Sequence, residues 1–147
     1  MNIVDLIRST PRCAVKPPAG MPVLAAGQTI PIDVAAFYAV CGGASLFHGE
    51  PYSLEIVPPT HFAKANPIIA GVEVPGDPSE DWYIFARNGE QFVSIDCGSK
   101  WNGRCYDSFW DRHAVAGSCP VVARSFSDFV RESLKRGGRG YYWLEHG

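Results

Sequence analysis

Two runs of aromatic and β-branched residues, joined by Asn88-Gly89, place the strongest constraint on how this chain folds. They lie in the segment DWYIFARNGEQFVSIDCG, residues 81–98. Asn-Gly between two alternating runs is the strongest short-range signal for a β-hairpin. The period-two alternation along each run is typical of a strand with two distinct faces. The sequence therefore predicts that residues 82–87 and 91–96 pair as antiparallel strands.

A helix is predicted on each side of this hairpin. In IPIDVAAFYAVCGG, residues 30–43, Pro31 suits a first helical turn and apolar residues recur at spacings of three and four. Gly42-Gly43 is predicted to end this helix with a left-handed residue. In SFSDFVRESLKRGG, residues 125–138, Ser125 is a capping residue and basic side chains fill the last turn. We expect residues 126–135 to be helical.

The order of helix, strands and helix predicts one α+β domain over residues 1–147, with a mostly antiparallel curved sheet and helices packed on one side. Residues 11–28 are rich in proline, glycine and alanine, so we expect residues 1–29 to be an irregular lead-in. The side chains expected to be mostly buried are Phe37, Trp82, Ile84, Ile95, Phe126 and Phe129.

The cysteines give no support for a catalytic thiol or a metal site. There are 5 of them, and none forms a Cys-x-x-Cys pair. Cys41 falls at the C-terminal end of its predicted helix, whereas a reactive thiol favours the N-terminal end, where the dipole lowers its pKa. We therefore expect buried thiols, no bound metal and no cofactor.

Charge is unevenly distributed along the chain, although the formal net charge is only -2. Residues 33–111 contain eleven acidic and four basic side chains, whereas both ends are net basic. Four acids and no base occur in EVPGDPSED, residues 73–81, whose prolines and glycine indicate a loop. Two interpretations remain open, a solvated loop or an acidic surface for a basic partner. The residues of that candidate surface are Glu73, Asp77, Glu80, Asp81 and the nearby Trp101.

Acids and a histidine also gather in YDSFWDRH, residues 106–113. A small hydrolase or metal-dependent enzyme using Asp96, Asp107, Asp111 and His113 is therefore the alternative hypothesis, although their spacing matches no standard metal site. A lone carboxylate at a strand end, such as Asp96, more often bonds a turn than catalyses.

Three segments together resemble the SUKH superfamily, the Smi/Knr-type proteins. They are IPIDVAAFYAVCGG, then DWYIFARNGEQFVSIDCGSKWNGRCY, then VVARSFSDFVRESL, in the order that the family shows. The resemblance covers about residues 30–136. Cys41 stands where the family usually has asparagine, and residues 11–28 show no clear counterpart of its N-terminal helical region.

The resemblance implies a non-enzymatic binding protein. Many bacterial members are immunity proteins that neutralise a cognate toxin, often a nuclease, and fungal relatives regulate the cell wall. No catalytic residue is attributed to the family. The mild net charge gives no reason to expect direct binding of nucleic acid, and no apolar run approaches the roughly 20 residues of a membrane helix. The N-terminus does not resemble a signal peptide, so we expect a cytoplasmic protein.

Overall fold

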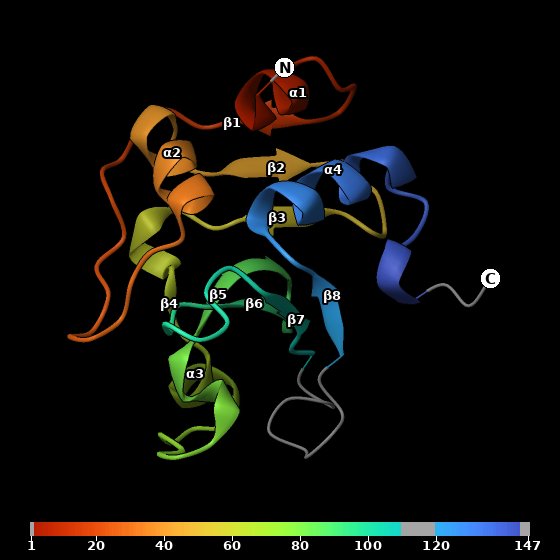
Figure 1. Cartoon of the computed structure of the whole chain (residues 1–147). Helices are drawn as coiled ribbons and strands as arrows, with labels where there is room; N and C mark the ends of the chain where they lie inside the picture. The colour runs from red at the N-terminus through yellow and green to blue at the C-terminus, as the bar shows by residue number, and fades with distance from the viewer. Residues whose placement is uncertain (1, 110–119, 145–147) are drawn as a thin grey trace.

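An antiparallel sheet of eight strands organises the computed structural model, which describes residues 2–109 and 120–144 (Figure 1). Its strands are joined in the order β1-β2-β3-β5-β6-β7-β8, and β4 pairs with β5 beside this path. The strands are β1 (Ala14–Val15), β2 (Ala44–Leu46), β3 (Leu54–Ile56), β4 (Ala63–Lys64), β5 (Trp82–Asn88), β6 (Gln91–Asp96), β7 (Cys105–Asp107) and β8 (Val121–Ala123). The predicted α+β class with a curved antiparallel sheet is confirmed.

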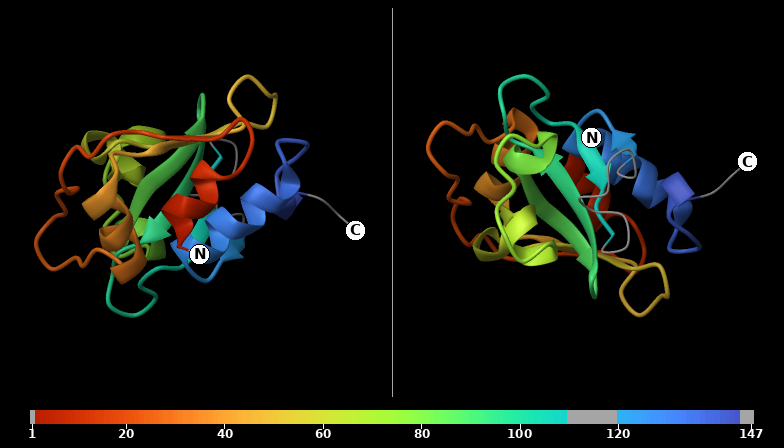
Figure 2. Two further views of the ribbon diagram at one scale, coloured as in Figure 1. Left: turned by 90° about the horizontal axis from the view of Figure 1, so that it is seen from above. Right: turned by 90° about the horizontal axis from the view of Figure 1, so that it is seen from below.

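Three helices pack together over one face of the sheet, as Figures 1 and 2 show. They are α1 (Ile3–Arg8), α2 (Ile32–Val40) and α4 (Phe126–Arg136). The short α3 (Ala65–Ile69) lies apart from them, next to β5. Single turns of 3-10 helix, η1 (Pro59–His61), η2 (Pro78–Asp81) and η3 (Tyr142–Leu144), complete the described elements. No helix among the described residues has the length and apolar character that spanning a membrane requires.

The predicted hairpin is confirmed. Strands β5 and β6 pair from Trp82 with Asp96 at one end to Asn88 with Gln91 at the other. Gly89 takes a φ of 60° at the first position of the two-residue turn, which a residue without Cβ adopts at little cost. The register shifts between Ile84 and Ala86, so the intervening residue forms a β-bulge that the alternating pattern did not predict.

Helix α4 begins and ends where the sequence predicts. The Ser125 hydroxyl accepts a hydrogen bond from the Asp128 backbone N–H at 3.1 Å, which satisfies one of the free donors of the first turn. Gly137 ends the helix with a φ of 67°. Because the Ser125 cap and Gly137 fix the two ends of α4, its apolar face packs onto the sheet in one orientation.

Helix α2 ends differently from the prediction. The helix stops at Cys41, which is extended with a φ of -151°, and the positive φ of 119° falls at Gly43, two residues later, instead of at the helix end. The two glycines instead permit close backbone packing. A Cβ on Gly42 would lie 2.3 Å from the Pro17 carbonyl oxygen, and one on Gly43 would lie 2.6 Å from the Ile56 carbonyl oxygen. The double glycine therefore joins α2 to the sheet and to the preceding segment.

Regular structure also occurs where the sequence predicted an irregular lead-in. Helix α1 is capped by the Asn2 side chain, which accepts a hydrogen bond from the Asp5 backbone N–H at 2.9 Å. Its Ile7 is fully buried, and β1 pairs with β2 at the edge of the sheet. The expectation for residues 1–29 is thus wrong for α1 and β1, whereas residues 16–30 contain no helix or strand.

The core lies between the sheet and its three helices. All six side chains expected to be buried are at most 5% exposed: Phe37, Trp82, Ile84, Ile95, Phe126 and Phe129. Trp82 and Ile84 alternate with Tyr83 along β5, so these two are buried on the face of the sheet opposite the three helices. Rings from α2 and α4 meet on the helix side, with Phe37 and Phe126 centroids 5.0 Å apart. Phe85, the bulge residue, lies with its ring centroid 5.0 Å from that of Phe129. The bulge thus contributes an additional aromatic ring to the contact with α4.

Replacing Phe129 by alanine tests this core. Phe129 is fully buried and contacts the rings of Phe85 and Trp143, so Phe129→Ala leaves a cavity in the contact between α4 and the sheet. We expect a loss of about 3–5 kcal/mol in the free energy of unfolding, measured by urea denaturation. Val121→Ala, at a side chain 48% exposed, is the control and should change it by less than about 1 kcal/mol. A similar small loss for Phe129→Ala would contradict the described packing.

Candidate protein-interaction site

The acidic segment and the turn that contains Trp101 leave the sheet at the same end of the hairpin. Trp82 pairs with Asp96 in the last pair of β5 and β6. Residues 73–81 therefore enter β5 beside the point where residues 97–104 leave β6. The structure thus brings Asp81 and the Trp101 turn to one end of the sheet, which we call the acidic end.

A third segment links the two loops of the acidic end. The Gln28 side-chain amide donates a hydrogen bond to Asp81 Oδ1 at 2.8 Å. The Thr29 backbone N–H donates to the Cys97 carbonyl oxygen at 2.8 Å, and the Asn102 side chain donates to the Thr29 carbonyl oxygen at 2.8 Å. The loop before α2 therefore fixes the position of both neighbouring segments.

Two carboxylates approach Gly98 from opposite loops. The Gly98 backbone N–H donates to Asp96 Oδ1 at 2.8 Å. A Cβ on Gly98 would lie 2.5 Å from Asp81 Oδ2 and 3.1 Å from Asp96 Oδ1, so no larger residue fits there without displacing a carboxylate. Asp96 is 5% exposed and bonds the turn, as expected for a carboxylate at a strand end. Burial raises the pKa of Asp96, the Gly98 hydrogen bond opposes the rise, and the charge of Asp81 adds to it.

The other three acids of the predicted surface are held by local contacts. Glu73 forms an ion pair with Lys64 at 3.3 Å between Oε2 and Nζ. Asp77 caps η2 by accepting from the Ser79 backbone N–H at 2.9 Å, and Glu80 accepts from the Gly76 backbone N–H at 3.2 Å. Glu73 and Asp77 are exposed and Glu80 is half-exposed. The segment is therefore ordered by its own acids and still presents negative charge to solvent.

Trp101 is exposed, but two cationic side chains lie near its ring. Its side chain is 45% exposed, and the Arg104 guanidinium carbon lies 3.7 Å from the ring centroid. The Lys100 ammonium lies 5.5 Å from the same centroid. Both cations favour the face of an indole ring. Positive charge therefore borders the acidic end on this side.

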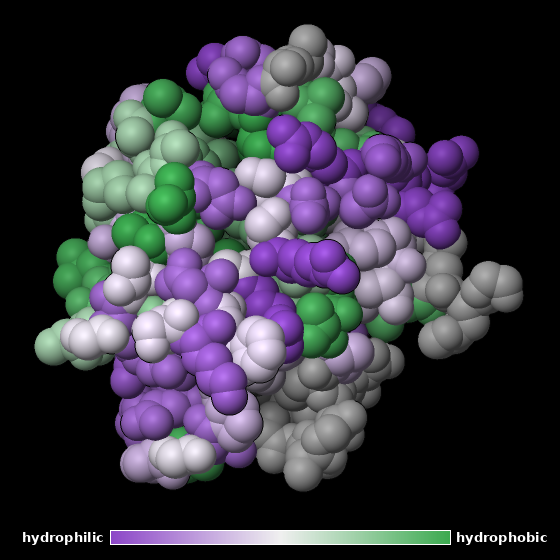
Figure 3. Space-filling view, viewed as in Figure 1, coloured by the Kyte–Doolittle hydropathy of each residue, from purple (hydrophilic) through white to green (hydrophobic). Residues whose placement is uncertain are grey.

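An apolar groove that the sequence did not reveal lies beside the acidic end. It has a volume of about 500 Å³ and lies between the loop before α2 and the β4 region. Met21 and Val23 border it with exposed fractions of 46% and 88%, and Phe62 and Tyr83 line it. Figure 3 shows apolar side chains over this loop and a hydrophilic region below them, around α3. Only the fold brings the loop against β5, so no local pattern predicts the groove.

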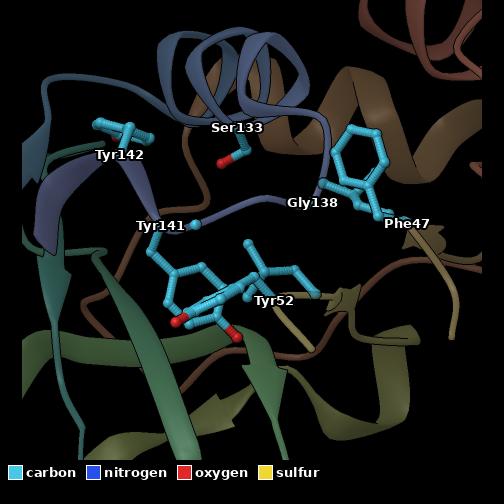
Figure 4. A pocket seen from close by; sticks show the side chains of 9 residues that line it. Phe47, Tyr52, Ser133, Gly138, Tyr141 and Tyr142 are labelled. Carbon is cyan, nitrogen blue, oxygen red and sulfur yellow. The ribbon is translucent and has the colours of Figure 1, made fainter. Parts of the chain in front are cut away.

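Two further hollows differ from this groove, one in polarity and the other in size. A polar groove of about 570 Å³ on the sheet contains Lys16 and Arg87, both paired with Glu55 at 3.0 and 2.8 Å. Partial burial opposes ionisation of Glu55, but hydrogen bonds from these two cations hold its pKa below the ordinary value. The hollow beneath α4, into which the Ser133 hydroxyl points, is about 10 Å³ and has room for a water-sized molecule at most (Figure 4).

The alternative enzymatic site is not assembled among the described residues. Asp107 of β7 pairs with Val93 of β6, and Asp96 lies three residues further along β6. Successive side chains of a strand alternate between the two faces of the sheet, so Asp96 and Asp107 project from opposite faces. Asp107 is fully buried, and it accepts hydrogen bonds from the Phe109 backbone N–H and the Trp143 indole. Asp111 and His113 lie outside the described residues.

The expectation of buried cysteines is confirmed for three of the thiols, whereas Cys13 is half-buried and Cys119 lies outside the described residues. Cys41, Cys97 and Cys105 are fully buried, and Cys41 Sγ donates to the Phe37 carbonyl oxygen at 3.3 Å. Burial raises the pKa of the Cys41 thiol and raises that of Cys97 to about 12, so neither forms a nucleophilic thiolate near neutral pH. Within residues 2–109 and 120–144, no group of three or more His, Cys, Asp or Glu side chains could hold a metal ion.

The fold defines a small α+β protein whose described surface carries the acidic end and the apolar groove. No family model matches the chain. The chain is 38% identical over 143 residues to "Immunity protein YokJ" of Bacillus subtilis (strain 168), a match that spans 97% of this chain and 87% of that protein. This chain belongs to the same family as that protein.

The raised pKa of Asp96 predicts a pH dependence of stability. As the pH rises above about 4, the ordinary pKa of an aspartate, Asp96 loses its proton in the unfolded state before it does so in the folded state. This earlier ionisation stabilises the unfolded state relative to the folded one. The contribution of Asp96 to stability is therefore fully present at lower pH and is lost as pH rises through its folded pKa. Asp96→Asn retains an oxygen for the Gly98 hydrogen bond but does not titrate.

Urea denaturation of both proteins from about pH 3 to about pH 7 measures this effect. The free energy of unfolding of the natural protein minus that of Asp96→Asn should fall as pH rises and then become constant. A difference that rises with pH would show that the Asp96 carboxylate is stabilised by the fold instead.

Proposed function

We propose that this protein is an immunity protein that binds a cognate toxin and neutralises it without catalysing a reaction. The observation on which the proposal rests is the 38% identity to an immunity protein along nearly the whole chain. Immunity of this kind requires only a surface complementary to the toxin. The described part of the chain accordingly offers exposed charge and an apolar groove, while Cys41, Cys97, Cys105 and Asp107 are buried in packing contacts.

We further infer that the protein belongs to the SUKH superfamily. The three segments that resemble the family all belong to one domain. They form α2 with its double glycine, the β5–β6 hairpin with β7, and α4. Close packing at Gly43 gives the first segment a physical role, because a side chain there would meet the backbone of β3. The departure at Cys41 is accommodated, since its small side chain is fully buried.

We place toxin binding at the acidic end, through Glu73, Asp77, Glu80, Asp81 and Trp101. Enzymes that act on polyanions have basic active-site clefts, and an acidic surface blocks such a cleft by resembling phosphate charge. A nuclease is therefore the toxin class that this surface fits best. Charges at the edge of an interface mainly raise the association rate and make it sensitive to salt. The protein would act in the cytoplasm and needs no cofactor for this function.

The test uses the cognate toxin domain, sought among the genes that neighbour this one. The natural protein should bind it and restore growth to cells that express it. Reversing Glu73 and Glu80 to lysine should slow association severalfold at low salt and reduce the salt dependence, because both acids present charge to solvent. Association rates are measured by stopped flow or surface plasmon resonance. Asp77 and Asp81 are left intact, since they cap η2 and hold Gln28.

The matched control reverses Glu90 and Glu132 to lysine, which changes net charge by the same amount. Glu90 lies in the turn at the opposite end of the hairpin, and Glu132 lies on the exposed side of α4. The control should leave the association rate close to that of the natural protein. Equal slowing by both pairs would show that only total charge matters. Absence of binding by the natural protein would refute the proposed function itself.

A further inference from the structure

We propose that the apolar groove beside the acidic end receives an apolar side chain of the toxin, one that is flanked by basic residues on the toxin surface. The inference rests on the proposed function and adds the chemical character of the toxin surface. It also assigns a binding role to Met21 and Val23.

The exposed apolar residues at the groove are the first argument. Val23 is 88% exposed and Met21 is 46% exposed, and between them Pro22 is buried. Exposed apolar side chains beside a groove of about 500 Å³ form the kind of surface that proteins use to contact one another. Covering these side chains with a partner removes their apolar surface from water, which favours binding.

The loop is held in place before any partner arrives. At its start, the Gly42 backbone N–H donates to the Lys16 carbonyl oxygen at 3.0 Å, and the Lys16 N–H donates to the Gly43 carbonyl oxygen at 2.9 Å. Further along, the Ala25 backbone N–H donates to the Tyr83 hydroxyl at 2.9 Å. A partner therefore pays little entropy for ordering the loop, and this preorganisation increases affinity.

The floor of the groove is aromatic and fixed. The rings of Phe62 and Tyr83 stack with centroids 5.4 Å apart and an interplanar angle of 21°. Phe62 also meets Tyr38 of α2 edge-on at 6.0 Å, so the core supports it from behind. The Tyr83 hydroxyl is occupied by Ala25 and Gln28, and Phe62 and Tyr83 are each only 3% exposed. The rings therefore form a rigid base, and Met21 and Val23 supply the exposed apolar surface of the groove. An aliphatic or aromatic side chain fits such a floor.

Charge at the edge of the groove selects a basic partner. On one side Lys64 lines the groove and forms an ion pair with Glu73. On the other side Tyr83 is linked through Gln28 to Asp81. Among the described residues, Lys64 is the one charged side chain that lines the groove, and Glu73 balances its charge. Asp81, beyond Gln28, then leaves the surroundings of the groove net negative, so an apolar centre is bordered by polar residues, as is usual for a protein interface. The polar groove on the sheet lacks this arrangement, because its two cations share the Glu55 carboxylate.

The test measures binding of the full chain to the toxin domain. Replacing Met21 and Val23 together by alanine should raise Kd by about tenfold or more. The effect should come mainly from faster dissociation, because short-range packing governs the lifetime of a complex. Thermal unfolding should stay close to that of the natural protein, since both side chains are exposed. The control Val121→Ala removes an apolar side chain that is 48% exposed on β8, a strand separated from β5 by β6 and β7, and should leave Kd unchanged.

The kinetics separate this inference from the proposed function. If the natural protein binds and the Met21 and Val23 variant dissociates at the natural rate, the groove is not a contact site and the inference is refuted, while the immunity function stands. If the natural protein does not bind the toxin, both are refuted. Faster dissociation of the groove variant, together with unchanged binding by Val121→Ala, supports the inference.

Discussion

The antiparallel pairing of β5 with β6 is the interaction on which the rest of the structure depends. It runs from Trp82 and Asp96 to the turn at Gly89. Phe85 of β5 contacts Phe126 and Phe129 of α4. The same register decides where the surface loops lie. Because Trp82 and Asp96 form the last pair, the acidic segment and the Trp101 turn emerge together. A shift of one residue would exchange the two faces of the strand and separate these features.

The acidic end and the groove are parts of one continuous region. The loop before α2 borders the groove through Met21 and Val23, and a few residues later it binds Asp81 through Gln28. Its start is held by the close approach of Gly42 to the backbone at Pro17. The double glycine therefore affects both the core and the candidate binding surface, since it positions the loop that joins them.

Features set by neighbouring residues were predictable from the sequence. The Gly89 turn, the Ser125 cap and the Gly137 end each depend on a few adjacent residues, and each was predicted correctly. The acidic segment was also visible, although its role in binding stays a prediction. Helix α1 was missed although its Asn2 cap is a local signal. Features set by tertiary contacts were also missed: β1, the true role of Gly42 and Gly43, the bulge at β5, and the groove. Their causes are backbone approaches and pairings between segments far apart in the chain, which periodicity does not record.

Hydrogen–deuterium exchange with and without the toxin domain tests most directly whether these loops form the binding surface. Amide exchange at short labelling times reports where the complex shields the backbone. The account predicts slower exchange in residues 17–28, 73–81 and 97–104, with little change in α4. Protection confined to the polar groove of Lys16, Glu55 and Arg87, or to the surface of α4, with these three loops unchanged, would contradict it.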